Sequence, residues 1–300
     1  MDTGILLESG TNELEVLEFS IAGNSYGINV AKVREILPYK PPTLIPNAHP
    51  CIEGVFMPRD EIITIVDLAK NLGRPASENP GKDMYIVTNF NKLNVGFHVH
   101  KVVGIHRVSW SEITKPDATL NYEGAGVATG IIKKDDRLIV ILDFEKIVSD
   151  ISPETGLKVS DIDHLGPRER NATPILIAED SALLGKLICD SISKAGYTNV
   201  TMTTNGQEAW DKLNEYKAAG VLEEKVKLVI TDIEMPQMDG HRLTKLIKDS
   251  AAFSHIPVVI FSSLVNDEMR KKGEALGADA QLSKPEIGKL VAEIDKILWK

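Results

Sequence analysis

The segment VKLVITDIEMPQMDG at positions 226–240 has the pattern of a buried strand that leads into a charged loop. Positions 226–231 are largely apolar and β-branched, which is typical of a strand covered on both faces. Asp232 follows directly, and apolar residues at helical spacing come next, at Leu243, Leu246 and Ile247. The segment therefore predicts a strand and a helix with a carboxylate between them.

The same alternation extends over positions 173–300. Short apolar runs at 175–178, 258–261 and 280–282 have the length of buried strands, and apolar residues recur at helical spacing in 183–192 and 287–298. Strands that alternate with helices form parallel sheets with helices on both faces. The predicted architecture of this half of the chain is α/β.

Polar side chains follow several of these strands. Glu179 and Asp180 close the first strand, Asp232 the third, Ser262 the fourth and Lys284 the fifth. The carboxyl ends of parallel strands lie at one edge of the sheet, where ligands bind. Three clustered carboxylates repel one another unless a cation neutralises them, and Mg²⁺ typically takes a few protein oxygens together with water and a phosphoryl oxygen. The pattern predicts a magnesium site that receives phosphate.

Asp232 is the predicted reactive group of this site. A carboxylate can attack phosphorus and form an aspartyl phosphate, while Mg²⁺ and the ammonium group of Lys284 neutralise charge on the transferred group. The hydroxyl of Ser262 could donate a hydrogen bond to the new phosphoryl oxygen, which would pull its loop inward. We therefore expect Asp232 to accept a phosphoryl group.

The first half of the chain is predicted to be all-β. Apolar and polar residues alternate at 17–21 and 26–30 on either side of a turn at 22–25, which indicates a hairpin. The pattern of 27–36 recurs in 96–105, and that of 54–67 recurs in 130–143, with a longer loop at 107–129 in the second copy. This duplication predicts two related β subdomains packed on each other.

Between the two halves the periodicity fades. The stretch 150–172 is polar and carries Ser152-Pro153 and Gly166-Pro167, so it is predicted to be a linker. The predicted domains are therefore 13–149 and 173–300.

Composition argues against several classes of partner. The chain has 300 residues, a formal net charge of −9, 5% aromatic residues and no block of Lys and Arg, so no nucleic acid is expected as a partner. No apolar run reaches the roughly 20 residues that span a bilayer. The first ten residues lack the pattern of a signal peptide, so we expect no direct membrane insertion and a cytoplasmic location.

Four sequence blocks carry a resemblance to the response-regulator receiver domain. They are IAEDS at 177–181, TDIEMPQMDG at 231–240, PVVIFSS at 257–263 and LSKP at 282–285. The resemblance implies a flavodoxin-like (βα)5 fold and phosphorylation of Asp232 by the phosphohistidine of a histidine kinase. It also implies that Mg²⁺ is bound by Glu179, Asp180, Asp232 and the backbone carbonyl of Glu234. Gln281 stands where this family often has a switching aromatic residue.

The first half resembles the CheW-like chemotaxis coupling domain over about 13–149. The resemblance rests on YGINVAKVREI at 26–36, Pro46, Gly54-Val55 and Val66-Asp67-Leu68. It implies two SH3-like β subdomains and a role in linking chemoreceptors to the histidine kinase CheA. Val33, Glu35 and Arg59 match positions that the family uses for receptor or kinase contacts. Arg59-Asp60 replaces the family's usual Arg-Gly pair.

The two domains on one chain resemble the CheV family of chemotaxis proteins. The resemblance implies an adaptor, not a conventional enzyme, that holds methyl-accepting chemoreceptors and CheA and changes their coupling when Asp232 is phosphorylated. Two alternatives stay open: a phosphate sink tethered to the kinase by its coupling domain, and a Mg²⁺-dependent phosphohydrolase, which Pro236 near Asp232 disfavours. His98 and His100 alternate on one strand without a third ligand, so they are expected to be structural or exposed histidines.

Overall fold

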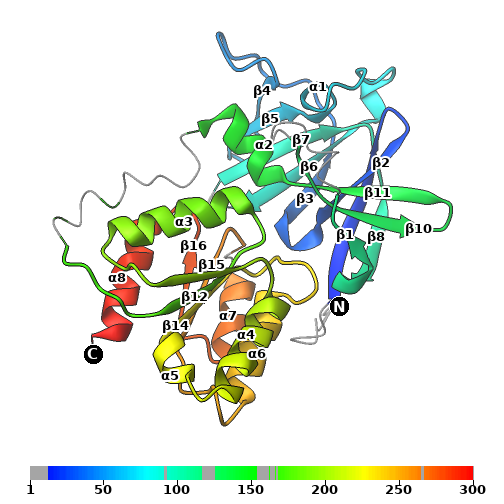
Figure 1. The fold of residues 1–300 in the computed structure, drawn as a ribbon. Helices are drawn as coiled ribbons and strands as arrows, with labels where there is room; N and C mark the ends of the chain where they lie inside the picture. Colours follow the sequence, from blue (N-terminus) through cyan, green and yellow to red (C-terminus); the bar gives the residue numbers. More distant parts are fainter. Residues whose placement is uncertain are drawn as a thin grey trace. The chain divides into compact units, whose positions relative to one another are not determined.

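The computed structural model describes residues 13–90, 93–116, 126–153, 162, 166, 168–264 and 267–299. The chain divides into two compact units, one formed by Leu14–Thr155 and the other by Gly156–Lys300 with Met1–Glu13 (Figure 1). Much of the predicted linker at 150–172, and part of the predicted longer loop at 107–129, lie outside the described residues. Within the described part of the chain, the helices are too short or too polar to cross a bilayer.

The unit formed by Leu14–Thr155, here called the β unit, contains two sheets with the strand orders β8-β1-β2-β11-β10-β9 and β3-β6-β7-β5-β4 (Figure 1). The strands of the first sheet are β1 Glu13–Ile21, β2 Asn24–Asn29, β8 Lys101–Ser109, β9 Ile113–Thr114, β10 Ala128–Lys134 and β11 Arg137–Leu142. Those of the second are β3 Val33–Pro38, β4 Ile52–Phe56, β5 Ile63–Asp67, β6 Met84–Phe90 and β7 Leu93–Val99. Short helices lie between strands, at η1 Val30–Lys32, α1 Leu68–Asn71, η2 Pro80–Lys82 and η3 Trp110–Glu112, and α2 Phe144–Ile151 follows the last strand. The predicted all-β class of this half is confirmed.

The hairpin expected around positions 22–25 is formed by β1 and β2. Phe19 lies opposite Tyr26 in an antiparallel register. The two turn residues, Ala22 and Gly23, have φ angles of 48° and 80°. Two consecutive positive φ values are the geometry of a type I′ turn, whose twist matches that of the flanking strands.

The two copies of the duplicated pattern exchange strands. β2 of the first copy pairs in parallel with β11 of the second, with Gly27 opposite Ile141. β7 of the second copy pairs in the same way with β5 of the first, with Gly96 opposite Ile65. A Cβ atom at Gly27 would lie 2.5 Å from Cγ1 of Val16, so glycine suits the close approach there. At Gly96 a Cβ atom would lie 2.6 Å from the terminal Cδ1 atom of Ile65. Each sheet therefore contains strands from both copies.

A shared apolar core joins the two sheets of the β unit. It includes Phe19 and Ile28 of the first sheet and Ile86 and Phe97 of the second. Phe144 of α2 packs edge-on against Phe97, with ring centroids 4.5 Å apart. Because the sheets share a core and exchange strands, we expect the β unit to fold as one cooperative unit.

The other unit, here called the α/β unit, has five parallel strands in the order β13-β12-β14-β15-β16. They are β12 Ile175–Ala178, β13 Val200–Thr203, β14 Leu228–Thr231, β15 Val258–Ser262 and β16 Ala280–Ser283. The helices are α3 Ala182–Lys194, α4 Gly206–Ala218, α5 Leu222–Lys225, α6 Gly240–Asp249, α7 Asp267–Ala275 and α8 Ile287–Leu298 (Figure 1). This strand order is that of flavodoxin-like folds, so the predicted class is confirmed.

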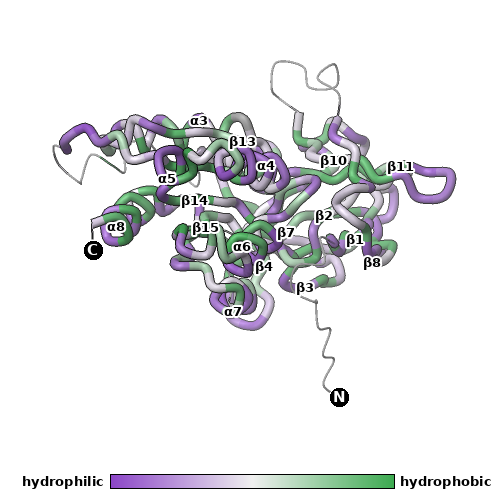
Figure 2. The backbone as a smooth tube through the Cα atoms, turned by 60° about the horizontal axis from the view of Figure 1, so that its bottom comes forward, coloured by the Kyte–Doolittle hydropathy of each residue, from purple (hydrophilic) through white to green (hydrophobic). Residues whose placement is uncertain are grey.

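Alternate residues of β12 face different cores. Ile175 and Ile177 belong to a cluster with residues of α3 and α8, and Leu176 and Ala178 belong to a cluster with residues of α4 and α6. Green and purple alternate along α8 in Figure 2, as expected for a helix with one apolar face against a sheet. Helices on both faces explain why the strand sequences are almost continuously apolar.

The second strand, β13, is the one for which the apolar pattern predicts no range. Its sequence is VTMT, and only Thr203 of its four residues is buried. An edge strand with polar residues lacks the apolar run that marks the central strands.

Candidate functional site

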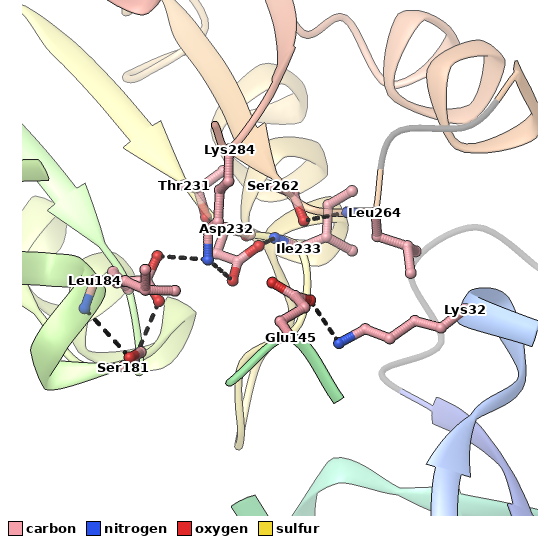
Figure 3. A network of polar contacts seen from close by, with 11 residues as sticks. Lys32, Glu145, Ser181, Leu184, Thr231, Asp232, Ile233, Ser262, Leu264 and Lys284 are labelled. Atoms are coloured by element: carbon pink, nitrogen blue, oxygen red, sulfur yellow. Dashed lines mark hydrogen bonds and ion pairs between the residues drawn. The ribbon is translucent and has the colours of Figure 1, made fainter. Parts of the chain in front are cut away.

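The predicted site residues of the α/β unit lie at the carboxyl ends of its parallel strands. Glu179 and Asp180 follow β12, Asp232 follows β14, Ser262 ends β15 and Lys284 follows β16. Figure 3 shows Lys284 and Ser262 approaching Asp232 from the strands that carry them. Residues more than 100 positions apart in the sequence are thus gathered at one end of the sheet, as the strand-end rule predicts.

Three carboxylates form a compact acidic cluster at this end of the sheet. One oxygen each from Glu179, Asp180 and Asp232 lies within 4.8 Å of the others. Glu179 and Asp232 are only 4% and 7% exposed, and Asp180 is partly exposed. Such an all-oxygen donor set, with one ligand open to solvent, can hold a hard divalent cation.

Lys284 bridges two of these carboxylates. Its Nζ atom lies 2.8 Å from Oε2 of Glu179 and 2.6 Å from Oδ2 of Asp232. The Lys284 side chain is 5% exposed, so these are buried ion pairs. One ammonium group does not balance three carboxylates, which leaves negative charge for a bound cation to neutralise.

The pKa of Glu179 is raised in these surroundings. Burial raises the pKa of Glu179 to about 8, against the opposing charge of Lys284 and with further raising by Asp232 and Asp180. A divalent cation at the cluster would favour the ionised carboxylate.

Asp232 is held by the backbone on both sides. Its Oδ1 atom accepts a hydrogen bond from Ile233 N at 2.6 Å, and its backbone N–H donates to Ala178 O at 3.0 Å. Thr231 Oγ1 donates to the carbonyl oxygen of Asp232 at 2.8 Å. The second carboxylate oxygen, Oδ2, is the one that contacts Lys284.

Gly240 has a structural role that the sequence reasoning did not assign. A Cβ atom there would lie 1.8 Å from the carbonyl oxygen of Asp232, so only glycine fits beside the loop that carries the site. The preceding residue, Asp239, caps α6 by accepting a hydrogen bond from Arg242 N at 2.7 Å. An Asp-Gly pair at a helix start, shortly after a strand-end carboxylate, is the signal that could have identified this packing.

Ser262 ends β15, and Glu234 follows Asp232 in the loop after β14. Ser262 is 1% exposed, and its Oγ atom accepts a hydrogen bond from Leu264 N at 3.2 Å (Figure 3). Glu234 lies in the same loop as Asp232, two residues further along. Its carbonyl oxygen as a metal ligand stays a prediction.

The side chain of Gln281 links β16 to α7 by a hydrogen bond. Its Nε2 atom donates to the carbonyl oxygen of Arg270 at 2.6 Å, and its side chain is 8% exposed. A Cβ atom at Gly273 would lie 2.5 Å from the Gln281 amide, so the absence of a side chain on α7 makes room for it. The position of the expected aromatic residue is therefore filled by a buried amide that bonds to the helix backbone.

In the β unit, the structure brings Glu35 and Arg59 together. Glu35 Oε2 lies 3.1 Å from Arg59 Nη2, and the Arg59 side chain is 79% exposed. Val33 begins the same strand as Glu35, but it is half-buried against the shared core. Arg59 and Asp60 have φ angles of 54° and 68°, which explains why glycine would fit the second position without strain.

Another ion pair of the β unit fixes the segment before β3. Lys32 Nζ on η1 lies 2.8 Å from Glu145 Oε1 on α2, and both side chains are mostly buried (Figure 3). The pair joins residues that are far apart in the sequence and precedes the strand that carries Glu35. It thereby limits the freedom of the backbone at the start of β3.

Comparisons with known proteins match both units. The family model described as "CheW-like domain" matches residues 15–152, and the "Response regulator receiver domain" model matches residues 175–295. Chemotaxis protein CheV3 of Helicobacter pylori is 34% identical, over 96% of this chain and 96% of that protein. Chemotaxis protein CheW of Thermotoga maritima is 30% identical, over 50% of this chain and 98% of that protein. The crystal structure of the scaffolding protein TtCheW from Thermoanaerobacter tengcongensis is 25% identical, covers 45% of this chain and 86% of that chain, and has a TM-score of 0.42.

Proposed function

Because the chain belongs to the CheV family of chemotaxis proteins, we propose that it is a signalling adaptor that couples chemoreceptors to the histidine kinase CheA and that phosphorylation of Asp232 changes this coupling. The observation that carries the proposal is a CheW-like unit joined, on one chain, to a receiver in which the carboxylates of Glu179 and Asp180 lie beside that of Asp232. A phosphate sink is not favoured, because relatives that match over the full chain are themselves chemotaxis CheV proteins. Through these partners the chain would associate with receptor arrays at the membrane.

The acidic cluster supports a magnesium-dependent phosphoryl acceptor. We propose that Glu179, Asp180, Asp232 and the carbonyl oxygen of Glu234 hold Mg²⁺. The bound ion would neutralise charge on the transferred phosphoryl group. An oxygen of Asp232 bonds to phosphorus as the P–N bond of a phosphohistidine breaks, and the ammonium group of Lys284 pairs with a phosphoryl oxygen.

Ser262 offers a route from this chemistry to a conformational change. Its Oγ atom now accepts from Leu264 N, so its own proton is free to be donated to a phosphoryl oxygen. Movement of Ser262 toward Asp232 would displace the carboxyl end of β15. Gln281 on β16 bonds to the backbone of α7 at Arg270. This bond would couple a displacement at the end of β15 to the position of α7.

Mg²⁺ is expected to stabilise the α/β unit, and the Asp180→Asn variant is expected to lose this effect. A ligand at a hundredfold excess over its Kd adds about 2.7 kcal/mol to the free energy of unfolding. Because the pKa of Glu179 is raised to about 8, a proton competes with the ion below that pH, so the stabilisation should grow between pH 6 and 9.

Thermal unfolding with and without Mg²⁺ measures this stabilisation. Asp190→Asn is the matched control, because Asp190 is an exposed carboxylate on α3 of the same unit. Equal stabilisation of the wild-type, Asp180→Asn and Asp190→Asn chains would exclude the proposed metal site.

The Arg59→Glu chain tests the proposed contact surface. The change places a carboxylate beside Glu35 on the exposed turn, where the two negative charges repel. If Arg59 contacts a partner, we expect about a thirtyfold loss of CheA recovered with receptor assemblies, the scale of an interface residue worth 2 kcal/mol. Because the side chain is 79% exposed, the free energy of unfolding should stay within about 0.5 kcal/mol of wild type.

Co-sedimentation of CheA with receptor-containing membranes gives the readout. Lys70→Glu is the control, since Lys70 is an exposed cation on α1 of the same unit. Full recovery of CheA with the Arg59→Glu chain would remove Arg59 from the proposed contacts.

A further inference from the structure

A second buried group of ionisable side chains lies in the β unit. His98 on β7 is 9% exposed, and each of its ring nitrogens faces a carboxylate. Nδ1 lies 2.7 Å from Oε1 of Glu53 on β4, and Nε2 lies 3.0 Å from Oδ2 of Asp83, the residue before β6. The imidazole therefore connects a strand at the edge of the sheet to the start of a strand inside it.

The two contacts require an additional proton. A neutral imidazole carries one N–H, so one of its nitrogens would point a lone pair at a carboxylate oxygen. Both contacts become hydrogen bonds when the imidazole is protonated at both nitrogens, or when one carboxyl group holds the proton. The second oxygen of each carboxylate has few other partners. Asp83 Oδ1 accepts a hydrogen bond from Ser77 Oγ at 2.9 Å, and Glu53 Oε2 is buried without a hydrogen-bond partner, so the charge of Glu53 depends on its contact with His98.

Two aromatic rings pack against the imidazole of His98. Tyr39, just beyond β3, stacks on the imidazole with ring centroids 4.7 Å apart, and Tyr85 of β6 meets it edge-on at 5.6 Å. Burial and the charge of Glu53 raise the pKa of both phenols, so they stay neutral near physiological pH. On the remaining neighbour, β5, the Asp67 carboxylate accepts a hydrogen bond from Lys70 N at the start of α1.

We propose that Glu53, His98 and Asp83 form a proton-binding clamp that holds β4 to the start of β6 and that loosens when the proton is lost. The clamp does not depend on the coupling function. It acts on the strands that position the Glu35–Arg59 pair: β6 pairs with β3 beside Glu35, and the turn that carries Arg59 follows β4.

The direction of the pH effect follows from the balance at His98. Burial has the largest single effect and lowers the pKa of His98, but the hydrogen bonds and charges of Glu53 and Asp83 together raise it above its ordinary value near 6.5. A group with a raised pKa in the folded state stabilises the fold fully below its unfolded pKa. The clamp is therefore closed below about pH 6.5 and is lost as the pH rises through the raised pKa.

Histidine side-chain NMR on the full chain tests the clamp directly. We expect His98 to titrate above the ordinary histidine value near 6.5, because the hydrogen bonds and charges of Glu53 and Asp83 favour the protonated imidazole. Glu53→Gln should lower the His98 midpoint, because it removes the negative charge and the hydrogen-bond acceptor that favour the protonated imidazole. A His98 midpoint at or below the ordinary histidine value near 6.5 would overturn the proposal.

Hydrogen exchange of the full chain, corrected for the intrinsic effect of pH, tests the consequence. Backbone protection of peptides from β4 and β6 should fall about tenfold between pH 6.5 and 9 in the wild type and in His49→Gln, and should stay level in His98→Gln. An equal fall in wild type and His98→Gln would contradict the clamp. If His98→Gln does not fold, the Glu53→Gln titration decides the question alone.

Discussion

The Asp232→Asn chain is expected to take up at least about a hundredfold less phosphate from phosphorylated CheA than the wild-type chain, the scale expected when a nucleophile is removed. The carboxamide has nearly the same shape but is not a nucleophile toward phosphorus. The neighbouring Glu179 carboxylate is already engaged by Lys284 and by Ser181 N. The measurement is transfer of labelled phosphate, followed by the acid lability and base lability that mark an aspartyl phosphate.

The control for this experiment is Asp190→Asn, which neutralises an exposed carboxylate of the same unit and should be labelled like the wild type. Circular dichroism of both variants verifies that the unit is folded. Acid-labile labelling that persists in the Asp232→Asn chain would assign the phosphoryl group to another residue and overturn the site.

Loss of Lys284 is expected to have the largest effect on stability. Lys284→Met removes the buried ammonium group that lies within 2.8 Å of both Glu179 and Asp232, so two buried carboxylates are left facing each other. Removing one partner of a buried ion pair lowers the free energy of unfolding by about 3–5 kcal/mol. We expect a loss of this size in the free energy of unfolding of the α/β unit without a divalent cation, and recovery of a large part of it with Mg²⁺.

Urea unfolding with and without Mg²⁺ measures both effects. Lys289→Met is the comparison, because Lys289 forms an ion pair with Glu286 at 2.6 Å but its side chain is 66% exposed. Exposed pairs contribute about 0–1 kcal/mol, so this variant should unfold nearly like the wild type. A Lys284→Met chain that is as stable as Lys289→Met in the absence of Mg²⁺ would contradict the buried ion-pair network.

Local patterns were sufficient to predict which side chains gather at the carboxyl ends of the strands in the α/β unit. Apolar runs locate the strands β12, β14, β15 and β16, and the strand-end rule then brings Glu179, Asp232 and Lys284 together without knowledge of any contact. The packing of Gly240 against the Asp232 carbonyl could not be predicted in the same way. It depends on the path of the backbone after the strand, which residue types alone do not determine.

In the β unit, local patterns do not predict how the strands pair. The duplication predicts two related subdomains, but not that β2 pairs with β11 and β7 with β5 across the two copies. Parallel pairing between distant strands leaves no mark on the local alternation of apolar and polar residues. The same limit applies to His98: the local pattern is consistent with a structural histidine, but it does not predict the two carboxylates, 45 and 15 positions away, that contact the ring.

The most direct test of the account is the autophosphorylation rate of CheA in receptor assemblies saturated with this chain, measured with and without beryllofluoride as a phosphoryl mimic at Asp232. The mimic adds no phosphate flux, so it separates a change in coupling from simple drainage of phosphate. We predict that the rate changes with the wild-type chain and stays constant with Asp232→Asn. The same rate with and without the mimic, for a wild-type chain shown to bind it, would contradict a coupling function controlled by Asp232.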